Sequence, residues 1–332
     1  QAAAAAMPWH VTTDPRMRRN FACGQQLFAK QVPILLYGAT GTGKDVFARA
    51  LHSGSLWSDR PFVTVNCAAI PESLIESELF GYRSGAFTGA AREGRVGKLL
   101  QSSGGTLFLD EIGDMPLLLQ ARLLRAIEAR EIVPVGSDQP VPVDLHVISA
   151  THRDLRRMIA DHEFREDLYY RLAGTTLELP ELKDRKDKGD LIHTLLREEC
   201  GNEEPVDISA SAYEHLLLYP WPGNIRQLRN TLRTAAALCS DRVIRPSNLP
   251  QEIVDSDVRP PAAAPAAALD GLPDVVDESA ATVLQNVERA ALVRALERYD
   301  WNVSHAAREL RISRTTLYRK FRKHAIVPPP RG

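Results

Sequence analysis

The stretch Gly38-Ala-Thr-Gly-Thr-Gly-Lys44-Asp45 decides the fold of this chain of 332 residues. It follows an apolar run, Val32 to Tyr37, and precedes the helical pattern Val46-Phe-Ala-Arg-Ala-Leu51. Glycines at this spacing let backbone N–H groups close around a β-phosphate, the helix N-terminus adds partial positive charge, and Lys44 reaches the β and γ oxygens. A glycine-rich surface turn without a ligand is the alternative, but the strand, the spacing and the lysine together predict a site for a nucleoside triphosphate.

The residues expected to contact ATP lie between the end of this strand and the first turn of the helix: Gly38, Gly41, Thr42, Gly43, Lys44, Asp45 and Val46. Asp45 stands where the general pattern has a Ser or Thr hydroxyl for magnesium, which weakens a match made on the pattern alone.

A second acidic element is needed to hold the metal and position water. Gly104-Gly-Thr-Leu-Phe-Leu-Asp110-Glu111 ends a β-rich apolar run, so we expect Asp110 to hold Mg²⁺ and Glu111 to polarise the attacking water. Adjacent carboxylates in a regular strand point to opposite faces, so the pair must lie at the strand's end, where open α/β sheets place their chemistry. A solvated acidic pair is the alternative, which the preceding phosphate loop disfavours.

Length and composition bound the class of protein. The chain suits two or three domains, and its 44% hydrophobic residues supply an ample core. The net charge is −1, yet residues 284–332 hold eleven Lys/Arg against four acids, a local charge of +7 that is typical of nucleic-acid binding.

The compartment follows from the cysteines and from the apolar runs. Four cysteines without close pairs argue against a zinc site or a disulfide framework and fit a reducing cytoplasm. No apolar run approaches about 18 residues, so no membrane span is predicted. Residues 1–6 are too short and uncharged for a signal peptide, and without an initiator Met the chain is expected to be a fragment of a longer protein.

Strand-like and helical patterns alternate through the first half of the chain. The strand-like runs are Ile34–Tyr37, Phe62–Val65, Thr106–Leu109, Val143–Ala150 and Thr175–Leu179. Between them, the leucines and isoleucine of residues 119–127 are spaced for one buried helical face. This alternation predicts an α/β fold with a mostly parallel sheet.

After Pro180 the β signal fades. Leu191–Glu199, Ala210–Tyr219 and Asn224–Leu238 have helical patterns and predict a small helical lid. Residues 254–273 then combine an alanine run with four prolines, a composition that predicts a semi-rigid linker.

The basic tail shows the spacing of three short helices, beginning near 284, 304 and 314, with Leu317 and Phe321 facing inward on the third. This pattern predicts a helix-turn-helix, and a solvated basic helix is the alternative. Ser313 can cap the third helix. The residues expected to meet major-groove base edges and phosphates are Ser313, Arg314, Thr315, Thr316, Tyr318, Arg319, Lys320 and Lys323.

One hexapeptide ties these parts to a known family. Gly85-Ala86-Phe87-Thr88-Gly89-Ala90, with the phosphate loop and the Leu-Phe-Leu-Asp-Glu strand, resembles the AAA+ ATPase domain of bacterial enhancer-binding proteins, the activators of sigma-54 RNA polymerase. The resemblance runs from about residue 16 to residue 253, and residues 302–324 are similar to the family's Fis-type DNA-binding domain. It implies that the six residues contact sigma-54. Physically, small residues make a mobile loop that presents Phe87 and Thr88, and the residues alone indicate only a flexible surface loop.

The resemblance also implies roles for single residues. Asn66 matches the asparagine that senses nucleotide and restrains the catalytic glutamate, here Glu111. Arg165 and Arg171 match arginines that reach a neighbouring subunit's γ-phosphate, a contact that raises turnover by about 10³–10⁵. Such fingers act in trans, so the head-to-tail contact must close into a ring, and the family forms hexamers. Arg226 matches the lid arginine that reads the nucleotide; an ordinary surface salt bridge is the alternative for each residue.

Four positions depart from the family's pattern. Asp45 is one methylene shorter than the usual Glu, which weakens its place beside Asp110 as a magnesium ligand. His152 stands where an asparagine is usual in the first sensor, and its ring can hydrogen-bond a phosphate or the water. Gln227 replaces a common Glu, and Arg311 takes a turn position where Gly is frequent.

The resulting hypothesis is a cytoplasmic ATPase, using ATP and Mg²⁺, that activates transcription. The tail binds a palindromic upstream element of double-stranded DNA as a dimer, and the ATPase assembles into a hexameric ring. Hydrolysis then drives the hexapeptide loop against sigma-54, so that the closed complex opens. One alternative is a repressor or sigma-70-type regulator that uses nucleotide only to oligomerise, and another is a clamp-loader or helicase-like enzyme that acts on DNA directly.

The expected division is an N-terminal tail at 1–15, an AAA+ α/β core at 16–179, a helical lid at 180–253, a Pro/Ala-rich linker at 254–280 and a Fis-type helix-turn-helix at 281–327. Residues 131–136 and 172–180 are similar to the acetoin and glycerol catabolism branch of the family.

Overall fold

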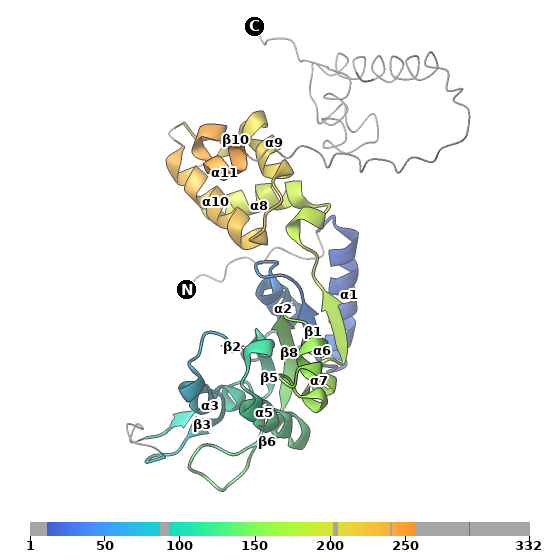
Figure 1. The fold of residues 1–332 in the computed structure, drawn as a ribbon, viewed down its shortest axis with the longest axis vertical. Coiled ribbons are helices and arrows are strands. Elements are labelled where there is room, and N and C mark those ends of the chain that lie inside the picture. The colour runs from blue at the N-terminus through green and yellow to red at the C-terminus, as the bar shows by residue number, and fades with distance from the viewer. Residues whose placement is uncertain (1–11, 87–92, 202–204, 240, 256–291, 293–332) are drawn as a thin grey trace, which may run out of the picture. The chain divides into compact units, whose positions relative to one another are not determined.

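Figure 1 shows a computed structural model of the chain, which describes residues 12–86, 93–201, 205–239, 241–255 and 292. Contacts divide the chain into two compact units, Gln1–Pro260 and Pro261–Gly332, and all described residues except Leu292 belong to the first. The helix-turn-helix predicted for 281–327 therefore lies outside the described residues, apart from that leucine.

A five-stranded sheet forms the centre of the first unit, in the order β2-β5-β8-β1-β9 with every neighbouring pair parallel. The strands are β1 (Ile34–Tyr37), β2 (Phe62–Asn66), β5 (Gly105–Asp110), β8 (Leu145–Thr151) and β9 (Thr175–Glu178). All five predicted strands and the predicted parallel α/β fold are thus confirmed, with bounds shifted by two residues at most. Parallel pairing puts the carboxyl ends of all five strands on one edge of the sheet.

Helices cover both faces of this sheet (Figure 1). On one face, α1 (Pro15–Ala29) and α2 (Lys44–Ser53) pack in a core with Ile34 and Leu36. On the other, Leu35 joins a core to which further helices contribute, among them α3 (Glu72–Phe80), α5 (Leu117–Ala129), α6 (Leu155–Ala160) and α7 (Glu166–Leu172). The two-residue period of a strand explains this division, because successive side chains point to opposite faces, and a strand buried on both sides reads as a continuous apolar run.

Two short hairpins project from the core near α3 and α5 (Figure 1). One joins β3 (Gly81–Tyr82) to β4 (Arg95–Val96), followed by α4 (Lys98–Gln101), and the other joins β6 (Glu131–Ile132) to β7 (Val141–Pro142). The backbones of the two hairpins are bonded together, since Arg83 N–H donates to the Val135 carbonyl at 3.0 Å. Gly85 and Ala86, the described part of the hexapeptide, follow β3 and lie close to this joint.

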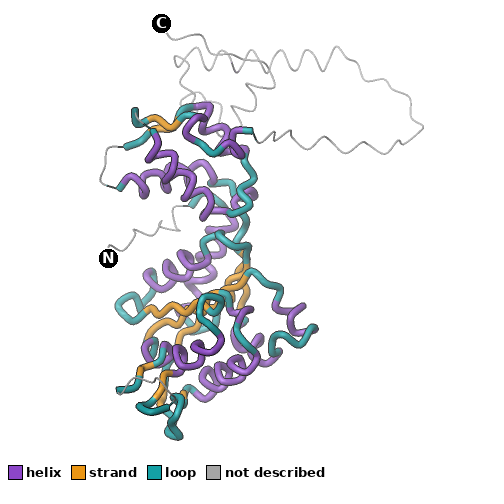
Figure 2. Tube along the Cα trace, turned by 60° about the vertical axis from the view of Figure 1, so that its left-hand side comes forward, coloured by secondary structure: helices purple, strands orange, loops and turns teal. Residues whose placement is uncertain are grey.

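The lid is mainly helical and has its own core (Figure 2). Its elements are η3 (Leu182–Asp184), α8 (Lys188–Cys200), β10 (Asp207–Ile208), α9 (Ala210–Leu218), α10 (Asn224–Leu238), β11 (Val243–Ile244), η4 (Pro246–Asn248) and α11 (Gln251–Val254). The three predicted lid helices are confirmed as α8, α9 and α10. Trp221 belongs to this core and is 1% exposed, with its indole N–H donating to the Leu216 carbonyl at 2.8 Å.

The start of the described chain is fixed to the segment that leads into the lid. Asp14 caps α1 through one carboxylate oxygen and accepts the Lys186 N–H at 2.9 Å through the other. Thr12 donates to the Asp187 carboxylate, which also receives the Arg185 guanidinium, and both members of this ion pair are buried. These contacts hold the beginning of α1 against residues 185–187, which connect the sheet to the lid.

Two further observations concern the whole described part. The four cysteines are all free thiols. None of the helices in the described ranges is long and apolar enough to cross a membrane.

The burial of two histidines leads us to expect that the free energy of unfolding decreases in mild acid. Burial lowers the pKa of His52, whose Nδ1 lies 2.9 Å from Thr106 Oγ1, and burial also lowers the pKa of His146, whose ring lies against Trp57. In the unfolded chain these two imidazoles take up a proton near pH 6.5, which is a higher pH than in the folded chain. Their contribution to the free energy of unfolding is therefore fully present above that pH and is lost as the pH falls through the folded pKa values. We expect the urea concentration at the unfolding midpoint to decrease when the pH is lowered from 7.5 to 5.5.

The variant His146→Phe tests this directly, because an aromatic ring without a titrating group should reduce the pH dependence. His162→Asn is the matched control, since His162 is exposed at φ 59°, which Asn tolerates, and it should keep the original pH dependence. Equal pH dependence in all three proteins would contradict the assignment.

Candidate nucleotide-binding site

The phosphate loop runs from the end of β1 to the start of α2. Gly43 is the N-cap of α2 at φ 90°, and no side chain caps this end of the helix, so its first N–H groups remain available to an anion. Lys44 is 5% exposed and its Nζ donates to the carbonyl oxygen of Gly38 at 2.8 Å. Thr42 Oγ1 donates to the Ala39 carbonyl at 2.8 Å, which fixes the turn.

The glycines of this loop are required by close backbone approaches. Gly41 has φ 80°, and a Cβ added there would lie 2.4 Å from the Gly223 carbonyl oxygen in the lid. A Cβ on Gly38 would lie 2.9 Å from the Leu179 carbonyl oxygen. The loop is therefore shaped by both the sheet and the lid, and its backbone N–H groups fit the phosphates of a nucleotide.

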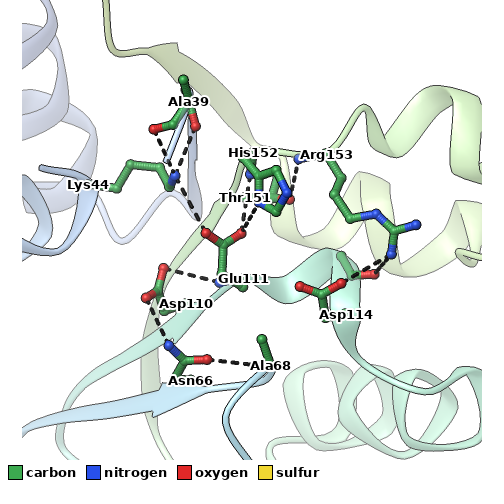
Figure 3. Close-up of polar contacts among 12 residues, drawn as sticks. Ala39, Lys44, Asn66, Ala68, Asp110, Glu111, Asp114, Thr151, His152 and Arg153 are labelled. Carbon is green, nitrogen blue, oxygen red and sulfur yellow. Dashed lines mark hydrogen bonds and ion pairs between the residues drawn. The ribbon is translucent and has the colours of Figure 1, made fainter. Parts of the chain in front are cut away.

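The acidic pair lies at the end of β5, next to this loop (Figure 3). Asp110 is the last strand residue, and Glu111 leaves the strand at φ 50° and ψ 50°, which breaks the pleat and lets both carboxylates reach the same edge. Glu111 Oε1 lies 3.7 Å from Lys44 Nζ, and Glu111 Oε2 lies 2.7 Å from His152 Nδ1. The sequence-predicted residues Lys44, Asp110, Glu111 and His152 thus gather at the carboxyl edge of the sheet.

The electrostatics of the pair favour a bound cation. Burial raises the pKa of the Asp110 carboxyl, the negative charge of Glu111 raises it further, and Lys44 lowers it. A magnesium ion would relieve this unfavourable burial, and Mg²⁺ is usually held by one or two carboxylates together with substrate phosphates. Among the residues that the structure describes, no cluster of three or more His, Cys, Asp or Glu side chains could hold a metal ion, and Asp110 is the candidate ligand at the end of β5. Asp45, the other candidate ligand, lies exposed in the first turn of α2.

Asn66 contacts the acidic pair differently from the expectation. Its Nδ2 donates to Asp110 Oδ2 at 3.4 Å, and its Oδ1 accepts the N–H groups of Ala68 and Ala69 at 3.0 Å. The cause is the register of β2 and β5, which places Asn66 opposite Asp110. In this structure the side chain that bonds Glu111 is His152.

The two candidate finger arginines lie elsewhere, on α7. Arg165 is the N-cap residue of α7, and its guanidinium donates to both oxygens of Asp167 at 3.0 and 2.7 Å. Arg171 Nη2 donates to the Ile127 carbonyl at 3.5 Å. Within the described part of one chain, neither guanidinium contacts Lys44 or the acidic pair.

The lid meets the phosphate loop through the first turn of α10. The N–H groups of Ile225 and Arg226 donate to the Gly41 carbonyl at 2.9 and 3.4 Å, so Arg226 begins beside the loop. Asn224 is buried at φ 51°, and its Nδ2 donates to the Thr40 carbonyl at 3.0 Å while its Oδ1 accepts the Leu182 N–H at 2.9 Å. Sequence reasoning missed Asn224, although an Asn after Pro-Gly at a helix start is a signal for a left-handed residue with a bonding amide.

The remaining predicted sites are only partly described. Gly85 has φ 75° with nothing within 4 Å of an added Cβ, and Ala86 N–H donates to the Arg83 carbonyl at 3.1 Å. A Cβ on Gly136, in the second hairpin, would lie 2.9 Å from the Ala86 Cβ. Residues 87–90 of the hexapeptide and the predicted DNA contacts at 313–323 lie outside the described residues.

Comparisons with known families cover most of the chain. The family model of the sigma-54 interaction domain matches residues 10–178, that of the AAA+ ATPase lid domain matches residues 183–266, and that of bacterial regulatory proteins of the Fis family matches residues 283–324.

Individual relatives agree with these matches. The chain is 44% identical to the acetoin catabolism regulatory protein of Cupriavidus necator over 96% of this chain and 47% of that protein, so it spans about half of that relative. It is 41% identical to the transcriptional regulatory protein ZraR of Salmonella typhi over 96% of this chain and 69% of that protein. The structure of NtrX from Brucella abortus in complex with ATP has a TM-score of 0.65 and 30% identity over 95% of this chain and 69% of that chain.

The bridging role of Asn224 generates a stability prediction. Asn224→Ala leaves the buried Leu182 N–H without its acceptor and puts a Cβ with no compensating bond at positive φ, so we expect a loss of about 1–3 kcal/mol in urea unfolding. Asn224→Gly removes the same hydrogen bonds but tolerates the backbone angle, so it should lose less. An alanine variant as stable as the original protein would contradict the bridge.

Proposed function

The chain belongs to the family of sigma-54-dependent transcriptional regulators, which join a sigma-54 interaction domain and an AAA+ lid to a Fis-family DNA-binding domain, and from that membership we propose an ATP-hydrolysing activator. In this proposal the protein binds an upstream DNA element and remodels the closed complex of sigma-54 RNA polymerase into an open complex. The observation that carries the proposal is that Lys44 and Glu111 lie close together beside the N-terminus of α2, which no side chain caps.

Each group at the carboxyl edge has a task in hydrolysis. The backbone of 38–43 binds the phosphates, and Lys44, already directed into the loop, neutralises the β and γ oxygens. Asp110 would hold magnesium, which would supply charge neutralisation on the phosphate oxygens. Glu111 accepts the proton of the attacking water, since its carboxylate lies next to Lys44 and so next to the γ-phosphate position.

The arginine fingers are supplied by a neighbouring protomer. Arg165 is 43% exposed at its side chain and is bonded to Asp167 of its own helix, away from the phosphate loop. A guanidinium placed in this way serves a second copy better than its own site, and repetition of such a head-to-tail contact closes a ring. We assign this ring the six protomers typical of the family, with Arg171 as the second finger.

The output is mechanical. The hexapeptide at 85–90 follows β3, and the backbones of Gly81 in β3 and of Arg83 just after it are bonded to Val135 in the second hairpin. Changes at the nucleotide edge move this pair of hairpins, and Phe87 and Thr88 press on sigma-54. The basic tail holds the protein on a palindromic DNA site as a dimer, with residues 313–323 at bases and phosphates.

Removal of the loop lysine tests the ATPase. Lys44→Ala should reduce phosphate release from Mg·ATP to background, because no other side chain of the loop supplies a positive charge. Lys30→Ala, at the exposed end of α1, is the control and should keep full turnover. Retained hydrolysis in the Lys44 variant would exclude this loop as the site.

A mixing experiment tests the shared site. Glu111→Gln and Arg165→Ala should each be inactive alone, because one lacks the base and the other the finger. An equal mixture should regain part of the phosphate release, since some contacts pair an intact Glu111 with an intact Arg165 from the neighbour. No recovery in a mixture that forms rings would show that the two residues do not act across a contact.

The hexapeptide is tested by separating hydrolysis from promoter opening. Thr88→Ala should leave ATP turnover largely intact and abolish open-complex formation, measured by permanganate reactivity of a sigma-54 promoter. Ser84→Ala, which removes a hydroxyl just outside the hexapeptide, is the control and should open the promoter normally. Normal opening by the Thr88 variant would remove the loop from the mechanism.

A further inference from the structure

We infer that His152 is a positioning residue that anchors the carboxylate of Glu111 by one oxygen and leaves the other oxygen free to take the proton of water. This inference rests on the proposed ATPase function. It gives His152 a task different from the contact with nucleotide that its place after β8 suggests.

Two donors of His152 converge on one oxygen of Glu111. The ring Nδ1 lies 2.7 Å from Oε2, and the backbone N–H of the same residue donates to Oε2 at 3.3 Å (Figure 3). The Glu111 side chain is 15% exposed, so it has limited room for other orientations. His152 itself follows directly on Thr151, the last residue of β8, and that rigid strand fixes its position.

The chemistry of the contact sets the direction of the bond. An ionised carboxylate only accepts hydrogen bonds, so the ring must carry a proton on Nδ1 and donate it. A short bond of 2.7 Å to a charged acceptor belongs to the stronger class of hydrogen bonds. Oε2 is therefore held from two directions and is unsuited to act as the base.

The second oxygen has a weaker and replaceable partner. Oε1 lies 3.7 Å from Lys44 Nζ, beyond hydrogen-bond distance, and Nζ is bonded instead to the Gly38 carbonyl. When Lys44 turns to the phosphates, Oε1 loses this neighbour while Oε2 keeps both of its donors. One fixed and one free oxygen is the arrangement that a general base needs.

Among the contacts of the described residues, the Asn66 side chain bonds Asp110 and not Glu111. Its amide nitrogen donates to Asp110, and its amide oxygen accepts the backbone N–H groups of residues 68 and 69. The restraint on Glu111 therefore comes from the strand β8 side of the site. Asparagine at position 152 would keep the anchor, because Nδ2 of Asn and Nδ1 of His are both attached to Cγ and have a similar reach.

The test is steady-state hydrolysis of Mg·ATP by the full chain and by two variants, His152→Ala and His152→Asn. Loss of the anchor should lower kcat about 10- to 100-fold in His152→Ala, as expected for a misplaced catalytic group, with KM for ATP unchanged within about 3-fold. His152→Asn should recover kcat to within about 3-fold of the original protein. His215→Ala, in the lid helix α9, is the matched control for loss of an imidazole, and thermal unfolding of each variant checks the fold.

Several outcomes would overturn the inference. An unchanged or raised kcat in His152→Ala would show that the ring does not position the base. Equal loss in the alanine and asparagine variants would contradict an anchor based on one donor, and a rise in KM alone would assign His152 to nucleotide binding. If the original protein releases no phosphate while it binds Mg·ATP, the proposed function itself fails.

A spectroscopic measurement tests the anchor independently of turnover. In protein labelled with ¹⁵N-histidine, the signal absent from His152→Asn identifies His152 and should show a proton on Nδ1. A bare Nδ1 would refute the anchor whatever the rate of hydrolysis.

Discussion

A buried ammonium group is the constraint on which the site depends. Lys44 is almost fully buried, and a buried charge is tolerated only with close polar partners. Those partners are the Gly38 carbonyl at the end of β1 and the Glu111 carboxylate beyond the end of β5. Neither strand alone provides them, so the position of the lysine requires the parallel order of the sheet, in which β8 lies between the two strands and leads directly into His152.

The same loop also holds the lid. The Gly41 carbonyl accepts the first N–H groups of α10, and Asn224 joins the loop to the segment that enters the lid. No larger residue fits at Gly41, because the lid backbone is already within contact distance of an added Cβ. A nucleotide bound in the loop would therefore lie at a segment that contacts both the core and the lid.

The sequence was sufficient for the parts that follow from local patterns. The apolar runs around residues 34–37 and 106–109 predicted buried parallel strands, and the glycine spacing before Lys44 predicted the loop. Residue contacts across the sheet could not be predicted in the same way, because they depend on strand register. Asn66 faces Asp110 through the pairing of β2 with β5, which no local sequence pattern reveals. Asn224 was missed because its role arises from three segments that are distant in sequence.

The central claim is that the catalytic site is complete only between two protomers. The most direct measurement is the specific rate of phosphate release from saturating Mg·ATP over a range of protein concentrations, with the mass of the particle measured in parallel. The account predicts negligible specific activity for the isolated protomer and a rise that follows ring formation. A specific activity that stays constant from monomer to assembled protein would contradict it.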